Sequence, residues 1–160
     1  LQLAVYAATL ANGGTRYQPT LIKSVKSYDY SRTVMENEPK VAQKLDIDPD
    51  NLQTVVNAMQ SVADEGGTAA ATFANYPIPI AIKTGTAEHM GGKDFDGNDN
   101  DHSVIIAFAP ADDPEIAVAV VGECAGHGSA TAPVARDIFD AYFQGEGEME
   151  SVPAEYTLQK

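Results

Sequence analysis

The spacing of apolar residues predicts a helix at the start of the chain. Apolar side chains recur at helical intervals over residues 1–11, and Asn12, Gly13 and Gly14 then form a typical helix stop. The pattern begins at Leu1 itself, without a Ser, Thr or Asp to cap the first turn. We therefore expect that the sequence begins inside or just before an element of a longer protein.

The following segment alternates in part between apolar and polar residues, as strands do. Residues 17–28 show this alternation and residues 33–35 offer a returning partner, so a hairpin is predicted, whereas residues 36–44 are polar and irregular. A second helix is expected to open at Asp48 or Asp50, either of which could be its cap, and to end at Gly66 and Gly67. Its apolar stripe consists of Leu52, Val55, Val56, Met59 and Val62.

The second half of the chain predicts three strands and a final helix. Residues 80–87, 103–109 and 116–122 are apolar runs, and the turn-rich joint between the last two implies an antiparallel pair. The near-continuous apolarity of residues 103–109 and 116–122 predicts cover on both faces of the sheet, and Phe73 and Tyr76 are expected to pack on it. The last helix is expected over residues 131–143. The order of elements predicts an α+β fold with an antiparallel sheet covered by helices.

Composition restricts the classes of partner. A hydrophobic content of 44% indicates a globular chain, while a formal net charge of −13 opposes binding to nucleic acid or to anionic lipid. The single cysteine, Cys124, has no internal partner for a disulfide, and its place near a strand end suggests a small buried hydrophobe. No apolar run reaches the ~18 residues of a membrane span, and no signal peptide opens the sequence.

Candidate chemistry is concentrated at the end of the strand over residues 80–87. Pro77 and Pro79 exclude a helix there and favour an edge strand, whose free backbone groups can pair with an extended peptide-like ligand. In an alternating strand Lys83 and Gly85 share one side, and the hydroxyls of Thr84 and Thr86 share the other. An ammonium and two hydroxyls around an unobstructed glycine suit a ligand that carries a carboxylate.

Several short motifs occur together in a fixed order. They are Gln2-Leu3-Ala4 leading to Ala11-Asn12-Gly13-Gly14, then Gly67-Thr68-Ala69, Lys83-Thr84-Gly85-Thr86-Ala87-Glu88 and Ala107-Phe108-Ala109-Pro110. In this order they resemble the C-terminal half of a class B penicillin-binding protein transpeptidase domain, in the serine penicillin-binding protein and β-lactamase superfamily, over roughly residues 1–143. We expect residues 1–145 to form this portion of the domain and the acidic residues 146–160 to form a flexible tail.

The resemblance implies a function and a set of site residues. Members of the family cross-link peptidoglycan stem peptides through an acyl-serine intermediate and are acylated by β-lactams. Lys83 would then supply positive potential for the substrate carboxylate and assist proton transfer, and Thr84 and Thr86 would hydrogen-bond that carboxylate. The Thr86 backbone N–H would be an oxyanion donor, and Gly85 would allow close approach. No cofactor is expected.

The family's nucleophile motifs, Ser-x-x-Lys and Ser-x-Asn, have no match in this sequence. We therefore expect this chain alone to be inactive, with the remainder of the transpeptidase domain as its partner. The resemblance also implies an extracytoplasmic location, with a membrane anchor in an absent N-terminal segment. We expect an unpaired edge on the strand over residues 116–122 as well, and hence self-association of the chain.

Other interpretations remain open. A bifunctional class A penicillin-binding protein is disfavoured by Ala87-Glu88 after the motif, a β-lactamase or β-lactam sensor domain shares less of the flanking pattern, and a non-catalytic binding module would need no serine. Glu88, His89 and His102 border a polar surface loop over residues 91–101, but no nucleophile motif accompanies them.

That loop has an Asp94-x-Asp96-x-Asn98-x-Asn100 spacing similar to a calcium loop. However, Asp99 stands where such a loop needs glycine and Ile105 where it needs glutamate. We therefore expect no metal.

Overall fold

The computed structural model describes residues 1–89, 93 and 100–144. Most of the polar loop over residues 91–101 and the whole predicted tail lie outside the described residues.

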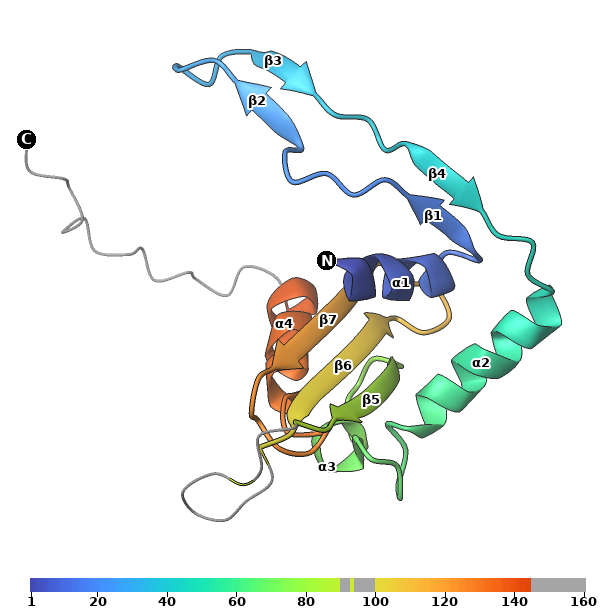
Figure 1. Cartoon of the computed structure of the whole chain (residues 1–160). Coiled ribbons are helices and arrows are strands. Elements are labelled where there is room, and N and C mark those ends of the chain that lie inside the picture. Colours follow the sequence, from blue (N-terminus) through green and yellow to red (C-terminus); the bar gives the residue numbers. More distant parts are fainter. Residues whose placement is uncertain (90–92, 94–99, 145–160) are drawn as a thin grey trace, which may run out of the picture.

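At the centre of the fold is a three-stranded antiparallel sheet of order β5-β6-β7. It is formed by β5 (Ala81–Ala87), β6 (His102–Ala109) and β7 (Ile116–Gly122) (Figure 1). The predicted antiparallel pair and the edge position of β5 are confirmed within this described sheet.

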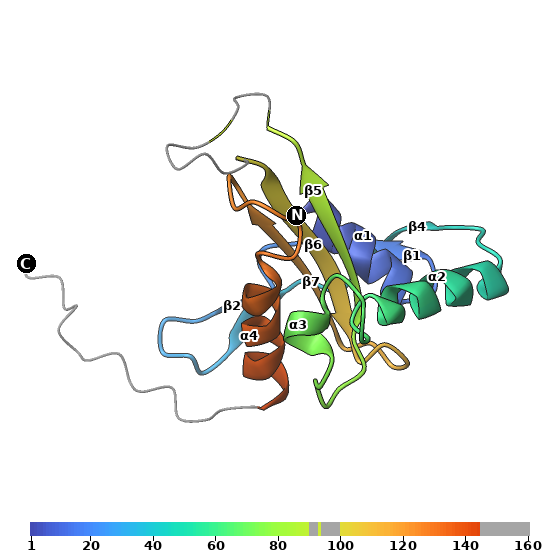
Figure 2. The ribbon, with the colours of Figure 1, turned by 90° about the horizontal axis from the view of Figure 1, so that it is seen from below.

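Helices cover both faces of the sheet, as the apolar strands predict. In Figure 2, α3 (Ala70–Phe73) and α4 (Ala132–Phe143) lie on one side of the strands, and α1 (Gln2–Ala11) and α2 (Pro49–Ser61) lie on the other. The predicted class, an α+β fold, is confirmed. The two helix layers bury two separate apolar clusters, and β6 contributes alternate side chains to each of them.

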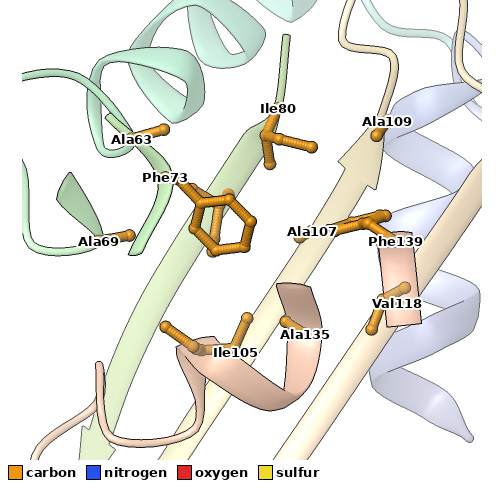
Figure 3. Close-up of a cluster of buried hydrophobic side chains, with 12 residues drawn as sticks. Ala63, Ala69, Phe73, Ile80, Ile105, Ala107, Ala109, Val118, Ala135 and Phe139 are labelled. Atoms are coloured by element: carbon orange, nitrogen blue, oxygen red, sulfur yellow. The ribbon is translucent and has the colours of Figure 1, made fainter. Parts of the chain in front are cut away.

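The larger cluster lies between the sheet and the helices α3 and α4 (Figure 3). The rings of Phe73 and Phe139 meet edge to face with centroids 6.3 Å apart, and Ile82 and Ile105 in the same cluster are fully buried. Removing a buried Phe side chain of this kind costs about 3–5 kcal/mol in folded domains. This cluster therefore fixes β5 firmly against β6 and α4. The smaller cluster consists of Ala7, Val56, Met59, Ala81, Ile106, Phe108 and Ala111.

Local signals in the sequence explain where the helices begin and end. Asp48 caps α2 by accepting hydrogen bonds from the backbone N–H groups of Asp50 (2.8 Å) and Asn51 (3.4 Å), which settles the choice left open between two aspartates. After α1, Gly13 and Gly14 adopt positive φ angles of 76° and 93°. The Gly14 N–H donates to the Thr9 carbonyl at 2.8 Å, so the helix ends at the predicted stop.

A two-stranded arm, here defined as residues 15–44, extends from the end of α1. It contains two ribbons: β1 (Thr15–Tyr17) pairs with β4 (Val41–Lys44), and β2 (Ser24–Lys26) pairs with β3 (Thr33–Glu36). The predicted hairpin is confirmed for β2 and β3. The expectation of irregular structure over residues 36–44 holds for residues 37–40 but is wrong for Glu36, which ends β3, and for residues 41–44, which form β4. Since both faces of this ribbon are exposed, its residues show no apolar alternation from which a strand could be predicted.

The structure contains one helix that the sequence does not predict, and it contradicts the expectation for Cys124. The four-residue helix α3 was not predicted, because four residues are too few to show helical periodicity. Cys124 is exposed, not buried, since it follows the end of β7 in a turn where its own φ angle is +52°. No helix within the described ranges combines the length and apolarity needed to cross a bilayer.

A polar cluster on the surface joins α3 to α4. The Tyr76 hydroxyl donates to Asp140 at 2.8 Å, the Arg136 guanidinium lies 5.4 Å from the centre of the Tyr76 ring, and Arg136 also donates to the Thr72 carbonyl at 2.8 Å. Partial burial, together with the bond to the Asp140 carboxylate, raises the pKa of Tyr76 to about 12. Tyr76 also packs against the larger cluster, as predicted.

Candidate functional site

The exposed end of β5 carries the residues expected to form the site. Going along the strand, Ile82 is buried, Lys83 is exposed, Thr84 is buried, and Gly85 and Thr86 are exposed. The alternation places Lys83 and Gly85 on one side of β5 and the two threonines on the other. Because β5 is the edge strand of the described sheet, alternate backbone N–H and C=O groups point away from β6.

Thr84 is held from a distant part of the chain. Its hydroxyl lies 2.8 Å from that of Thr68, in the turn between α2 and α3, and either hydroxyl could be the donor. Thr84 is only 9% exposed, whereas Thr68 is exposed. The Lys83 ammonium donates to the Thr84 carbonyl, so the cation lies close to the strand backbone. These contacts gather an ammonium and two hydroxyls around residues 83 and 84.

Thr86 is held by a residue 42 positions further along the chain. Its hydroxyl oxygen accepts a hydrogen bond of 2.9 Å from the backbone N–H of Gly128. Gly128 is in turn held by the buried Ser103 hydroxyl, which donates to the Gly128 carbonyl at 2.9 Å and lies 2.9 Å from the Thr131 hydroxyl. Because the Thr86 oxygen acts as acceptor here, its own O–H remains available to donate to a ligand.

Gly128 packs directly on the backbone of Gly85. A Cβ atom at Gly128 would lie 2.6 Å from the Gly85 carbonyl oxygen and 2.8 Å from its carbon. Gly128 must therefore be glycine for the loop to approach β5 so closely. Gly85 is different: a Cβ atom there would meet only Val104, at 3.8 Å, which is an ordinary contact. Neither its φ angle nor its own surroundings require glycine at position 85.

The histidines near the end of β5 lie together. The rings of His89 and His102 meet edge-on with centroids 5.2 Å apart. The backbone N–H of His89 donates to the Asp101 carboxylate at 3.1 Å. The backbone N–H of Cys124 donates to His102 Nδ1 at 2.9 Å, so neutral His102 carries its proton on Nε2.

Among the residues whose positions the structure gives, no three His, Cys, Asp or Glu side chains are placed to hold a metal ion. The calcium-like spacing lies mainly outside those residues.

The structure adds three residues to those expected from the sequence. Thr68 belongs to a motif that the sequence singles out, but only the fold shows that it contacts Thr84, 16 residues away. No pattern in the sequence indicates Gly128 or Ser103. Gly128 contacts Thr86 across 42 residues, and Ser103 contacts Gly128 across 25 residues. Lys83, Thr84, Gly85 and Thr86 do lie together, on one strand.

The comparison with known proteins agrees with the arrangement of helices, sheet and edge motif described above. Residues 1–140 match the family described as the penicillin binding protein transpeptidase domain. The chain belongs to this family. Its relatives are class B penicillin-binding proteins, and it corresponds to part of their transpeptidase domain, as the motifs indicate.

Curated relatives define the similarity further. The chain is 33% identical to penicillin-binding protein 2A of Bacillus subtilis, over 100% of this chain and 24% of the relative. It is 38% identical to the peptidoglycan D,D-transpeptidase PbpA of Mycobacterium tuberculosis, over 89% of this chain and 29% of that protein. The chain therefore spans about a quarter of the length of the curated relatives it matches.

Solved structures share the fold. The imipenem acyl-enzyme complex of penicillin-binding protein A from M. tuberculosis matches with a TM-score of 0.70 and 31% identity, over 87% of this chain and 29% of that one. Pseudomonas aeruginosa PBP2 in complex with WCK 5153 matches with a TM-score of 0.70 and 32% identity, over 99% of this chain and 33% of that one. The prediction of a β-lactamase-like transpeptidase fold is therefore confirmed.

Proposed function

We propose that the complete protein is a serine-type D,D-transpeptidase that cross-links peptidoglycan stem peptides and is acylated by β-lactams. In this proposal the present chain supplies the strand edge against which the peptide or the β-lactam lies. The observation that carries the proposal is Gly85, an exposed edge-strand glycine that the fold itself does not require. Glycine in a strand costs roughly 0.5–1 kcal/mol relative to alanine, so a ligand that approaches the backbone closely explains it better than the fold does.

Lys83 provides the charge for this ligand. Its ammonium donates to the Thr84 carbonyl beside Gly85, and a carboxylate lying along the strand edge would come within reach of it. A hydrogen bond to a charged group contributes about 1.5–3 kcal/mol. We propose that Lys83 attracts the substrate carboxylate and assists proton transfer at the serine of the Ser-x-Asn motif elsewhere in the domain.

The two threonines differ in access to the ligand. The Thr86 hydroxyl accepts from Gly128 and can donate its proton to the carboxylate, while the Thr86 backbone N–H serves as an oxyanion donor. Thr84 is only 9% exposed and its hydroxyl is already paired with that of Thr68, so it is less accessible to a ligand than the exposed Thr86. Of the two hydroxyls proposed to bind the carboxylate, that of Thr86 is therefore the more important.

The nucleophile must come from the remainder of the domain, since the chain has no Ser-x-x-Lys sequence. The surface of α1 offers a place for that remainder. An apolar hollow of about 350 Å³ lies between α1 and the start of the arm, lined in part by Leu1, Val5, Tyr6 and Leu45. Leu1 and Tyr6 are exposed. We propose that the rest of the transpeptidase domain covers this hollow, and that the complete protein acts outside the cytoplasmic membrane, held by an N-terminal anchor.

A labelling experiment tests the proposal. The complete protein and the 160-residue chain are incubated with a fluorescent penicillin and separated on a denaturing gel, with unlabelled penicillin as competitor. We expect one competed adduct on the complete protein and none on the chain alone, because the chain lacks the nucleophile. If the complete folded protein formed no adduct, the proposed function would be wrong. A stoichiometric adduct on a serine of this chain would contradict the assignment of the nucleophile to the remainder.

A further inference from the structure

Charge is distributed very unevenly between the arm, residues 15–44, and the rest of the chain. The arm holds six of the ten basic residues and only three acidic residues, giving a net charge of +3. The described residues outside the arm, here called the body, carry thirteen carboxylates and three cations, a net charge of −10. The arm is thus a basic projection on a strongly acidic protein.

The arm is also apolar and exposed. No residue between 15 and 44 is buried, and nine large hydrophobic side chains there are exposed, among them Leu21, Tyr28 and Tyr30, at 93%, 102% and 79% exposure. Figure 1 shows the β2–β3 ribbon projecting beyond the helices and the sheet, and the main contacts of β2 and β3 are with each other. Tyrosine and arginine, which the arm exposes in Tyr28, Tyr30 and Arg32, are enriched among the residues that bind protein partners.

The tip of the arm is already ordered. The Asp29 carboxylate accepts hydrogen bonds from the hydroxyls of Ser27 (2.6 Å) and Ser31 (2.8 Å), and the Ser27 N–H donates to the Arg32 carbonyl at 2.9 Å. The serine bonds lower the pKa of Asp29 to about 2. These bonds hold the backbone that carries Tyr28 and Tyr30 in one conformation, so less backbone entropy is lost when a partner binds.

The arm does not satisfy its charge on its own body. Its base, β1, packs on α1, and the β2–β3 ribbon leads away from there (Figure 1). Among the described residues, no cation of the arm forms an ion pair with the body. The body of a second copy has the same net charge of −10, and as a separate molecule it can reach the projecting ribbon. We infer that the arm is a docking element that binds the acidic body of a second copy, with Tyr28, Tyr30 and Leu21 as apolar contacts and Lys23, Lys26 and Arg32 as the charged ones.

This inference does not depend on the proposed activity, and it differs from association through the unpaired edge of β7. Contacts between an arm of +3 and a body of −10 weaken as salt screens them, whereas pairing of β7 edges relies on backbone hydrogen bonds and apolar contacts. The two modes therefore respond differently to ionic strength and to changes in the arm.

Sedimentation equilibrium at low and high salt tests the inference. We expect the 160-residue chain to associate reversibly at low salt, and 0.5 M NaCl to weaken the association by at least about tenfold. The triple variant Lys23→Glu/Lys26→Glu/Arg32→Glu changes the arm's charge from +3 to −3 and should weaken it by at least about tenfold as well. The matched variant Lys23→Arg/Lys26→Arg/Arg32→Lys keeps the charge and should stay within about threefold of the parent. Circular dichroism and thermal melts check that both variants remain folded.

Cross-linking shows where the arm binds. In a Cys124→Ser background, Tyr28→Cys carries a photo-cross-linker, and mass spectrometry should find its adducts on body peptides of the second copy. A monomer at low salt, association unchanged in the triple glutamate variant, or adducts confined to the other arm would each overturn the inference. Binding of the monomer to vesicles of phosphatidylglycerol through Lys23, Lys26 and Arg32 would overturn it too, in favour of a membrane surface.

Discussion

Alanine substitutions at Gly85 and Gly128 should separate a glycine needed by a ligand from one needed by the fold. In Gly128→Ala the new Cβ would lie 2.6 Å from the Gly85 carbonyl oxygen, about 0.8 Å inside the 3.4 Å at which ordinary contacts begin. The atoms it meets belong to the backbone, so no side-chain rotation can relieve the overlap. Overpacking of this kind costs about 1–3 kcal/mol, which for a chain of this size lowers Tm by about 2–12 °C.

Gly85→Ala should behave in the opposite way. Its Cβ would meet only Val104 at 3.8 Å, so the variant should be as stable as the parent, or up to about 1 kcal/mol more stable because the unfolded chain loses freedom. In the complete protein the same methyl group would stand between β5 and the ligand. A clash costing about 1–3 kcal/mol would slow β-lactam acylation by about 5- to 150-fold.

The assay pairs thermal melts of both variants with second-order acylation rates measured on the complete protein. We expect Gly128→Ala to lower Tm and Gly85→Ala to lower only the acylation rate. If Gly85→Ala lowered Tm as much as Gly128→Ala, Gly85 would be a structural glycine. The argument that a ligand requires it would then fail.

Two further predictions concern stability. The folded-state pKa of Tyr76, about 12, lies above the ordinary value of 10.0, so the stability it contributes should be complete below pH 10 and be lost as the pH rises towards 12. The Tm difference between the parent and Tyr76→Phe should therefore shrink over that interval, and a difference independent of pH would contradict the assignment. Asp48→Ala should cost about 1 kcal/mol in urea unfolding through loss of the α2 cap, while Asp46→Ala should cost less than about 0.5 kcal/mol; equal effects would refute the cap.

Much of the fold could be predicted because its elements are defined by local patterns. The sheet strands are apolar runs between turns, α2 begins at an aspartate before proline, and α1 ends at two glycines. The elements that the sequence did not predict, β4 and α3, lack such patterns. The strand β4 has no buried face and hence no alternation, and α3 is shorter than two helical turns.

The candidate site was predictable only where its residues are consecutive. Lys83–Thr86 form one strand, so their alternation follows from strand geometry. The contacts from Thr68 and Gly128 join distant segments, and no spacing in the sequence predicts them. Cys124 was expected to be buried because cysteine usually is, but a turn residue with positive φ points outward here.

The most direct test of the central claim, that the end of β5 binds the ligand carboxylate, is the acylation rate of Lys83 variants in the complete protein. Lys83 is exposed, so Lys83→Ala should cost less than about 1 kcal/mol of stability while slowing β-lactam acylation by about 10- to 150-fold, the equivalent of one charge-assisted contact. Lys83→Arg should also be slow, because a planar guanidinium does not reproduce the position of a compact ammonium or its ability to transfer a proton. If Lys83→Ala were acylated at the parent rate with an unchanged melt, Lys83 would be a solvated surface lysine and the claim would be wrong.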